Sequence, residues 1–354
     1  MTILGLDIGG ANIKAADEAG RTISRPFAIW RQPERLKDQI TSILSVYPQT
    51  ERLALTMTAE LADCFSTKSD GVRFILDAVE SCLNASLSSR GEVGNSSAKL
   101  PRSNLMTWTT EGRFMNSDEA RKSPMQVAAA NWHALATWSM KFAPRGCGVL
   151  IDIGTTTTDI IPFEDGNIVP HGLTDVRRLQ SGELSYSGIR RTPLCAVAHS
   201  VPFQDGYCSI AAEIFATMQD VYLLLGDIAE DAQDLDTANG KPATKAAAHD
   251  RIARMLCCDR DEISFEQAVQ IAMFLADVQR QRLAGSLERV INRLSSACST
   301  VIVSGSGSFL ARQLILENRK TKDATVISLA DQLSPGIAEA ACAYAVAQLA
   351  SNSH

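Results

Sequence analysis

The chain has 354 residues, of which 45% are hydrophobic and 21% are charged. This is an ordinary globular composition at a length that usually divides into two domains. The net charge is −6, and no apolar run reaches the length of about eighteen residues that a membrane span needs. We therefore expect a cytoplasmic protein that acts on small-molecule substrates and has no nucleic-acid or membrane partner. The oligomeric state is left open, a homo-oligomer included.

Nine cysteines are scattered through the chain, mostly in apolar segments. None forms a CxxC pair, and no spacing is typical of a metal cluster. We interpret most of them as small buried hydrophobic residues.

Two segments about 145 residues apart share one pattern. Residues 3–16 (ILGLDIGGANIKAA) and 149–162 (VLIDIGTTTTDIIP) each run through apolar residues to an aspartate, turn at glycine, and continue as a second apolar stretch. This pattern is typical of a β-hairpin. One hairpin at the start of each half predicts two copies of one fold.

Between the hairpins, residues 53–57 are expected to form a strand and residues 71–87 an amphipathic helix. Residues 88–104 form a polar stretch that predicts a loop or flap. Alanines and tryptophans at helical spacing then predict a helix over 124–140, and 146–148 (GCG) is a plausible hinge. We place the first domain at 1–145 and the second at 146–354.

The second half is expected to be mainly helical after a turn at Asp165 and Gly166. The predicted helices cover 210–226, 245–256, 265–295, 308–316 and 335–349. Residues 233–244 predict an exposed loop. A strand at 300–304 ends in the glycine turn 305–307, and a short strand follows at 324–328. The last helix is expected to pack either on the second domain or back on the first.

The two hairpin turns suggest a site for phosphate and magnesium. A carboxylate at the end of a strand can hold Mg²⁺ through water, while the backbone amides of a glycine turn bind an anion. Residues 7–12 and 152–158 would clamp a phosphate chain from opposite sides, and 305–307 would leave room for an adenine or a similar flat group. The alternative is that all three are ordinary tight turns.

The order DIGGANIK, DIGTTTTD and VSGSG resembles the phosphate and adenosine motifs of the superfamily of actin, sugar kinases and heat-shock ATPases. That resemblance implies an α/β fold of two ribonuclease H-like domains with a ligand cleft between them. Residues 181–193 (SGELSYSGIRRTP) resemble the signature of its hydantoinase A and oxoprolinase branch. Residues 58–72, 128–132 and 212–226 resemble a small subfamily of that branch, which serves tetrahydromethanopterin-linked one-carbon transfer and methanofuran biosynthesis.

The subfamily resemblance implies a pyrophosphate-releasing transferase of one-carbon metabolism. An aminomethylfuran-methyl diphosphate would lose pyrophosphate as the phenol oxygen of a tyramine or tyrosine analogue attacks its methylene carbon. Magnesium and preorganised amides would neutralise the leaving diphosphate. The implied cofactor is Mg²⁺, with ATP or a diphosphate substrate in the cleft.

On this interpretation Asp7 and Asp152 would hold magnesium. The candidates for holding the phosphate or the cofactor are Gly9, Gly10, Asn12, Lys14, Gly154, Thr155, Thr156, Thr157, Gly305, Ser306 and Gly307. Lys68 is a second candidate cation for phosphate, and it could equally be a solvated surface charge, as could Lys14.

A base must lie within reach of the phenol, and Asp159, Glu183 and Asp63 are the candidates. Glu183 could equally fix a loop. Arg190 and Arg191 could bind a substrate carboxylate in fork geometry, and we expect one of them only to brace its loop.

Two other functions remain open at this stage. The same loops in distant relatives serve ATP-dependent small-molecule kinases and hydantoinase- or oxoprolinase-like hydrolases. Heat-shock relatives are instead nucleotide sensors that signal to partners. Only a few residues follow the last predicted helix, so we expect no appended output domain or ring-opening unit, which argues against the sensor and against a complete oxoprolinase.

Overall fold

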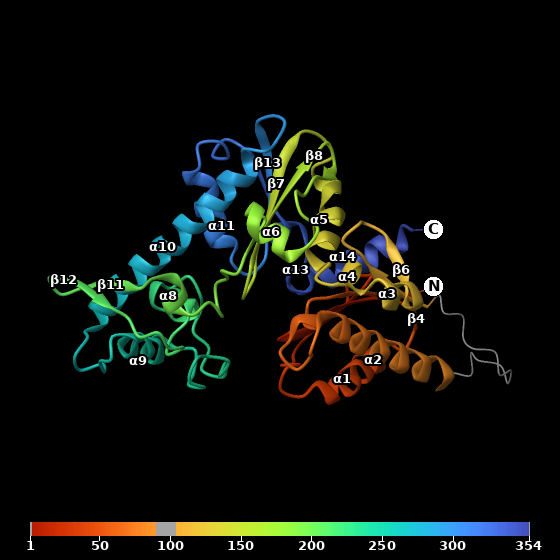
Figure 1. Ribbon diagram of the computed structural model, residues 1–354, viewed down its shortest axis with the longest axis horizontal. Helices are drawn as coiled ribbons and strands as arrows, with labels where there is room; N and C mark the ends of the chain where they lie inside the picture. The colour runs from red at the N-terminus through yellow and green to blue at the C-terminus, as the bar shows by residue number, and fades with distance from the viewer. Residues whose placement is uncertain (1, 90–103, 354) are drawn as a thin grey trace.

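The computed structural model describes residues 2–89 and 104–353, and it is built on two mixed β-sheets (Figure 1). The first sheet has the strand order β3-β2-β1-β4-β5-β6. The second has the order β10-β8-β7-β13-β14, with β9 paired to β8. In both sheets an antiparallel hairpin lies beside parallel strands, since β1 pairs parallel with β4 and β7 with β13. The expected pair of related α/β domains is confirmed.

The first sheet consists of β1 (Thr2–Ile8), β2 (Asn12–Asp17), β3 (Thr22–Pro26), β4 (Thr50–Met57), β5 (Leu105–Trp108) and β6 (Phe114–Asn116). The helices beside it are α1 (Leu36–Val46), α2 (Lys68–Ser89), α3 (Ser117–Lys122) and α4 (Pro124–Val127). We call this sheet with α1–α4 the first lobe.

The second sheet consists of β7 (Cys147–Ile153), β8 (Thr158–Glu164), β9 (Asn167–Ile168), β10 (Leu184–Ser185), β13 (Cys298–Ser304) and β14 (Thr325–Ser328). The other elements of this half are α6 (Asp175–Ser181), α7 (Leu194–Val197), β11 (Ser200–Phe203), β12 (Gly206–Ser209), α8 (Met218–Leu225), α9 (Lys245–Met255), α10 (Phe265–Ile291), α11 (Ser308–Glu317) and α12 (Leu329–Gln332). Together they form the second lobe.

Successive side chains of a strand point to opposite faces of the sheet, and this alternation decides on which face each hairpin aspartate lies. On β1, Leu4, Leu6 and Ile8 pack into a core with α1 and α2 on the outer face. Gly5 and Asp7 therefore lie on the inner face. On β7 the odd-numbered residues 149, 151 and 153 pack in the core that contains α10 and α11, so the inner face carries Leu150 and Asp152.

Two helices, α5 (Asn131–Ser139) and α14 (Ala341–Ser351), form a layer between the sheets (Figure 1). Ala345 of α14 packs with Leu150 of the second sheet, whereas Val346 packs with Ile3 of the first. A Cβ at Gly5 would lie 1.9 Å from the Ala343 carbonyl oxygen, so only glycine allows α14 to lie this close to β1. The last helix thus contacts both sheets.

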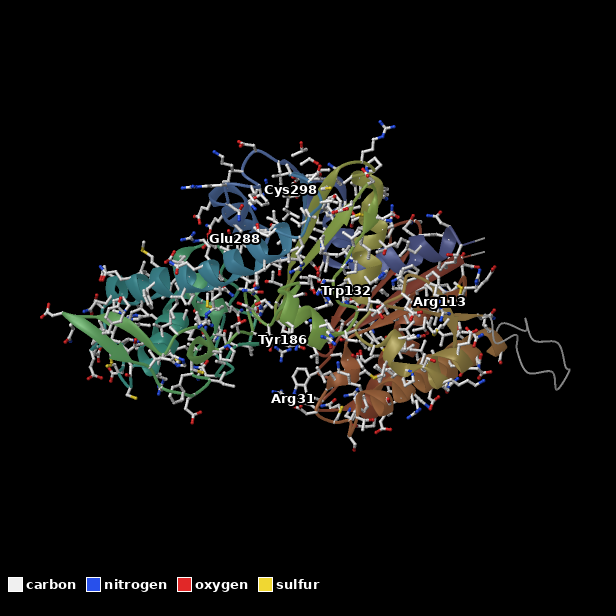
Figure 2. All side chains as sticks on the ribbon, turned by 45° about the horizontal axis from the view of Figure 1, so that its top comes forward. Arg31, Arg113, Trp132, Tyr186, Glu288 and Cys298 are labelled. Carbon is white, nitrogen blue, oxygen red and sulfur yellow. The ribbon has the colours of Figure 1, made fainter. Side chains whose placement is uncertain are left out.

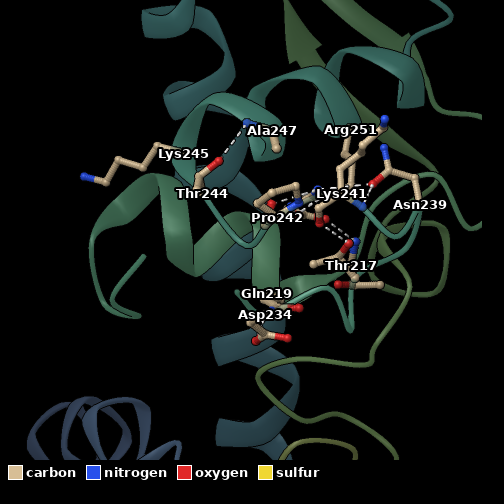
Figure 3. A network of polar contacts seen from close by, with 12 residues as sticks. Thr217, Gln219, Asp234, Asn239, Lys241, Pro242, Thr244, Lys245, Ala247 and Arg251 are labelled. Atoms are coloured by element: carbon tan, nitrogen blue, oxygen red, sulfur yellow. Dashed lines mark hydrogen bonds and ion pairs between the residues drawn. The ribbon is translucent and has the colours of Figure 1, made fainter. Parts of the chain in front are cut away.

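The predicted helix over 210–226 begins only at Met218, because Thr217 and Asp220 form a capping box there. Asp220 also pairs with the fully buried Arg251 at 2.6 Å. The Arg251 guanidinium donates to the Pro242 carbonyl, inside the predicted loop 233–244 (Figure 3). These contacts hold α8 against α9 at the far end of the long helix α10.

Three other predicted boundaries differ from the structure. The helix expected over 124–140 is divided into α4 and α5, and Ala129 between them has a φ of 48°. The last predicted helix is divided into α13 (Pro335–Glu339) and α14. In the proposed hinge, Cys147 and Gly148 belong to β7, so only Gly146 precedes the strand. Most of the predicted polar loop 88–104 lies outside the described residues, because α2 ends at Ser89 and the structure resumes at Asn104.

Candidate active site

The turns of the two hairpins are closed by the same backbone hydrogen bond. The Gly9 amide donates to the Asn12 carbonyl at 2.9 Å, and the Gly154 amide donates to the Thr157 carbonyl at 2.9 Å. A Cβ at Gly10 would meet no atom within 4 Å, so the first turn borders open space. The internal repeat seen in the sequence is therefore also a repeat of structure, because both segments are antiparallel hairpins closed by the same hydrogen bond.

Neighbouring segments hold both turns by their carbonyl groups. Ile29 donates its amide to the Gly10 carbonyl, and Arg191 donates its amide to the Thr155 carbonyl at 2.9 Å. A trans peptide points its N–H away from its own C=O. The amides that follow these carbonyls, at Ala11 and Thr156, therefore point away from the bracing segments. Such amides are suited to bind an anion.

Asp7 and Asp152 are the two carboxylates beside these turns. Burial raises the pKa of Asp7 to about 6, and Lys14 partly offsets this rise. Its Oδ1 atom has no hydrogen-bond partner among the described residues. Burial also raises the pKa of Asp152 to about 6, with a further increase from Asp159, while a hydrogen bond from Ser304 and the charge of Lys14 lower it. Both sites therefore favour a cation or a proton next to the carboxylate.

The two aspartates belong to one electrostatic site. Asp7 raises the pKa of Asp152, and Lys14 acts on both carboxyl groups. Cys342, in the first turn of α14, is close enough to both aspartates that their charges raise the pKa of its thiol, after the larger effect of burial. The positive end of the α14 dipole thus lies beside the carboxylates, which favours a bound anion there. The lysine is fixed by a 2.8 Å hydrogen bond from its Nζ to the Glu339 carbonyl.

The residues present fit a magnesium ion bound to a phosphate chain. Mg²⁺ usually takes one or two protein carboxylates and completes its shell with water and phosphate oxygens. Asp7 and Asp152 supply the carboxylates, and the unpartnered Oδ1 of Asp7 is a free donor atom for the metal or its water. Within residues 2–89 and 104–353, no group of three or more His, Cys, Asp or Glu residues forms a closed metal cage.

Asp159 lies opposite Asp152 on β8 and is held by an arginine. Its Oδ1 accepts a 2.5 Å hydrogen bond from the buried Arg178, whose guanidinium stacks 3.9 Å from the Trp132 ring. Burial raises the pKa of Asp159, and Arg178 acts in the opposite direction. Because this carboxylate already has a cationic partner, it is a weaker candidate for the base than the sequence indicates.

Glu183 is completely buried, and its oxygens are occupied by protein groups. It accepts the amide of His171 at 2.7 Å and pairs with Arg293 at 3.0 Å. These contacts correspond to the loop-fixing role that the sequence left open, because both oxygens of Glu183 already accept hydrogen bonds from the protein.

The two arginines of the RRTP segment have different partners. Arg190 pairs with Asp234 at 2.6 Å, next to Gln219 in the loop region of Figure 3. The Arg191 guanidinium lies 4.8 Å from the ring centre of Trp30 in the first lobe. Arg191 is thus placed between the lobes, whereas Arg190 braces the second lobe.

Gly305 and Gly307, in the turn 305–307 after β13, pack closely against the second hairpin. A Cβ at Gly305 would lie 2.6 Å from Asp152 Oδ1, and one at Gly307 would lie 2.4 Å from Ile153 Cγ2. Ser306 is exposed. The turn therefore needs glycine to approach the second hairpin, a reason that sequence reasoning did not include. Whether a flat ligand group also lies there stays a prediction.

Lys68 and Asp175 join the lobes by an ion pair with a nitrogen–oxygen distance of 2.7 Å. Tyr186 lies near this pair, because both charges affect the pKa of its hydroxyl. Figure 2 shows Tyr186 at the edge of the second lobe that faces the first. Lys68 is thus a cross-lobe contact rather than a solvated surface charge.

Glu60 stands beside this ion pair and was missed by the sequence analysis. Its side chain is only 1% exposed, and neither carboxylate oxygen has a hydrogen-bond partner among the described residues. Burial raises its pKa to about 7, with smaller effects that include Lys68 and Asp175. Asp63, the candidate from the same segment, is exposed. A usable signal was present, because Glu60 is the first carboxylate after β4, the strand parallel to β1.

The model of one known protein family covers most of the chain. The model of the hydantoinase/oxoprolinase family matches residues 51–351. The chain belongs to the hydantoinase/oxoprolinase family. The match begins after the first hairpin, so it contains Asp152 and Glu60 but not Asp7.

Two relatives extend the assignment beyond the hydantoinase/oxoprolinase family model. The chain is 30% identical over 351 residues to the (4-{4-[2-(gamma-L-glutamylamino)ethyl]phenoxymethyl}furan-2-yl)methanamine synthase of Methanocaldococcus jannaschii. This alignment covers 98% of this chain and 97% of that protein. It is also 30% identical over 204 residues to the protein of that name from Methanococcus vannielii, spanning 58% of this chain and 90% of that protein. The chain is thus related to an enzyme along nearly its whole length.

A solved structure supports the fold of this hydantoinase/oxoprolinase family member. A nucleotide-free acetone carboxylase chain, from work on ATP-dependent acetone carboxylation, superposes with a TM-score of 0.58. The alignment covers 98% of this chain and 70% of that chain at 11% identity, so it bears on the fold alone. In the described part of this chain, no helix is both long and apolar enough to span a membrane.

Proposed function

We propose that this protein is a transferase of methanofuran-type cofactor biosynthesis. It condenses an aminomethylfuran-methyl diphosphate with the phenol oxygen of a tyramine- or tyrosine-type acceptor and releases pyrophosphate. The observation that supports this most is the near full-length similarity to a synthase whose name describes a phenoxymethyl-furan ether. The paired turns of Asp7 and Asp152 add a site suited to a diphosphate.

The leaving group is bound by the two turns in this proposal. Amides such as those of Ala11 and Thr156 point away from their bracing segments and bind phosphate oxygens. Lys14 adds a positive charge, and its position is fixed by the Glu339 carbonyl. Asp7 and Asp152 orient magnesium, which when bound neutralises charge that develops on the departing diphosphate.

The methylene carbon becomes electrophilic only while the diphosphate is stabilised. As the phenol oxygen forms its bond to this carbon, the bond between the carbon and the diphosphate oxygen breaks, and the electron pair leaves with pyrophosphate. Preorganised donors at the leaving group lower the barrier, because they stabilise charge that is larger in the transition state than in the substrate.

An assay with the purified protein and Mg²⁺ tests the proposal. With the aminomethylfuran diphosphate and tyramine, we expect pyrophosphate and the aryl ether in equal amounts, measured by a pyrophosphate assay and mass spectrometry. Phenethylamine, which lacks only the hydroxyl group of tyramine, serves as the matched control acceptor and should give no ether. Phosphate release from ATP at a catalytic rate, with no reaction of the diphosphate, would instead favour an ATP-dependent kinase or a hydantoinase-like hydrolase.

A further inference from the structure

The most unusual group outside the two turns is the carboxylate of Glu60. A buried carboxylate without hydrogen bonds is costly, because its charge loses the solvation of water and gains nothing in return. The backbone amides of Glu60 and Ala129 face it and favour its ionised form, yet no donor reaches either oxygen with hydrogen-bond geometry. A group of this kind is frequently functional.

The position of Glu60 connects it to the leaving-group site. The chain leaves β4 at Met57, and the Thr58 amide donates to the Ile8 carbonyl at the end of β1. Thr58 Oγ1 would lie 3.6 Å from a Cβ on Gly9. Glu60 therefore lies two residues along the chain from Thr58, which borders the first phosphate turn, at the edge of the sheet where β1 and β4 both end.

The charged surroundings of Glu60 come from both lobes. Lys68 at the start of α2 favours its ionised form, and Asp175 at the start of α6 disfavours it. Tyr186 of the second lobe lies within electrostatic range of Glu60 and also of Asp159, which faces Asp152. Charged groups from both lobes thus act on Glu60, and Tyr186 is under the influence of both Glu60 and Asp159.

We propose that the Glu60 carboxylate accepts the proton of the acceptor's hydroxyl group in the condensation. This inference rests on the proposed function and adds a residue to it. The hydroxyl proton moves to a Glu60 oxygen, the oxygen lone pair forms the ether bond, and the electron pair of the broken carbon–oxygen bond leaves with pyrophosphate. The proton later passes from Glu60 to solvent or to the product anion.

The other candidate bases are less suited to this step. Asp159 is paired with Arg178, and Glu183 accepts two backbone amides and pairs with Arg293. Asp63 is exposed. A pKa of about 7 lets Glu60 be ionised at neutral pH and still bind a proton readily, which is the range that favours general-base catalysis.

Access to Glu60 requires a movement of its surroundings. Both carboxylate oxygens are screened from solvent, and the nearby Lys68–Asp175 pair joins the lobes. The acceptor therefore enters when this pair separates, with Tyr186, whose side chain is 55% exposed, beside it. In the bound state the acceptor hydroxyl supplies the hydrogen bond that Glu60 lacks in this structure.

A series of acceptors with different hydroxyl acidities tests the base role. Glu60→Gln keeps the shape of the side chain but removes the basic oxygen. We expect it to lower the rate of ether formation with tyramine by about 10²- to 10⁴-fold. The loss should shrink at least tenfold with a nitro-substituted tyramine, whose hydroxyl is already ionised near neutral pH. The control variant is Glu51→Gln, at the exposed opposite end of β4, and it should match the unmodified protein with both acceptors.

The possible outcomes separate a failure of the base role of Glu60 from a failure of the proposed transferase function. An equal loss for tyramine and its nitro derivative, or no loss at all, would overturn the base role of Glu60. If the unmodified protein releases no pyrophosphate with either acceptor, the proposed function fails and the base role fails with it. A variant with unchanged circular dichroism and a loss that depends on acceptor acidity would support both.

Discussion

Lys14 and Asp159 occupy equivalent positions in the two hairpins and carry opposite charges. Lys14 on β2 lies directly opposite Asp7, and Asp159 on β8 lies directly opposite Asp152. The first hairpin therefore supplies a cation next to its carboxylate, whereas the second supplies another anion. In the proposed site, Lys14 would add the positive charge for phosphate oxygens, and Asp7 and Asp152 would hold the metal, because Asp159 is already paired with Arg178.

The first prediction concerns Asp7 and Asp152, the carboxylates proposed to hold magnesium. Asp7→Asn and Asp152→Asn should each reduce pyrophosphate release by at least about 100-fold, because a neutral amide neither balances the charge of Mg²⁺ nor orients its water. Circular dichroism should show an intact fold. Asp205→Asn, in the exposed turn between β11 and β12, is the control and should retain full activity. Near-normal activity of both active-site variants would disprove the assignment of the turns.

The second prediction concerns stability and pH. Glu60 has a pKa of about 7 in the fold, against an ordinary value of 4.5. The folded state thus binds this proton more tightly than the unfolded state, so Glu60 contributes less to stability as the pH rises from about 4.5 through 7. Glu60→Gln should remove this decline and be more stable than the unmodified protein at pH 8, by up to about 3 kcal/mol. Parallel urea melts at pH 5 and pH 8 measure the difference. If the free energies of unfolding of the variant and the unmodified protein differ by the same amount at both pH values, the prediction is wrong.

The third prediction concerns the ion pair between the lobes. Lys68→Glu places two negative charges at the contact with Asp175 and should separate the lobes, which small-angle scattering detects as a larger radius of gyration. Asp175→Lys alone should have a similar effect. The double charge swap should restore the compact form, because it rebuilds the pair with reversed polarity. If the double variant is as expanded as the single ones, the pair does not hold the lobes together.

Small-angle scattering can also test whether the two lobes move when a ligand binds. We expect closure around a diphosphate, with the pivot near residues 146–148, where Gly146 precedes β7. Scattering profiles with and without Mg²⁺ and the diphosphate should then differ. Identical profiles would count against a closing movement.

The fourth prediction separates a structural carboxylate from a catalytic one. Glu183→Gln should reduce the free energy of unfolding by about 1–3 kcal/mol, because the charged acceptor of the His171 amide and the partner of Arg293 is lost. Well below the melting temperature, kcat should change less than threefold. A large loss of kcat at unchanged stability would instead indicate that Glu183 acts as the base.

The sequence by itself determined the two hairpins and their aspartates. A strand has a two-residue period, so the alternation around Asp7 and Asp152 already placed each on a face of its strand, and the glycines marked the turns. Residues 245–256, 265–295 and 308–316 were likewise recognised as helices, because their apolar spacing is local information. The breaks at Ala129 and between α13 and α14 were missed, since the surrounding residues favour a helix.

Only the tertiary structure decided which charged groups meet. Lys68 and Asp175 are 107 residues apart in the chain and pair because the lobes come together there. The sequence analysis named Asp63 and not Glu60, because the position of Glu60 just after β4 does not show by itself that its side chain is buried whereas that of Asp63 is exposed. The position of α14 between the sheets could not be predicted either, because an alanine-rich helix can pack on either sheet. In the structure, α14 packs closely on β1 because Gly5 has no side chain. Burial and the pairing of distant charges are properties of packing, and local periodicity does not contain them.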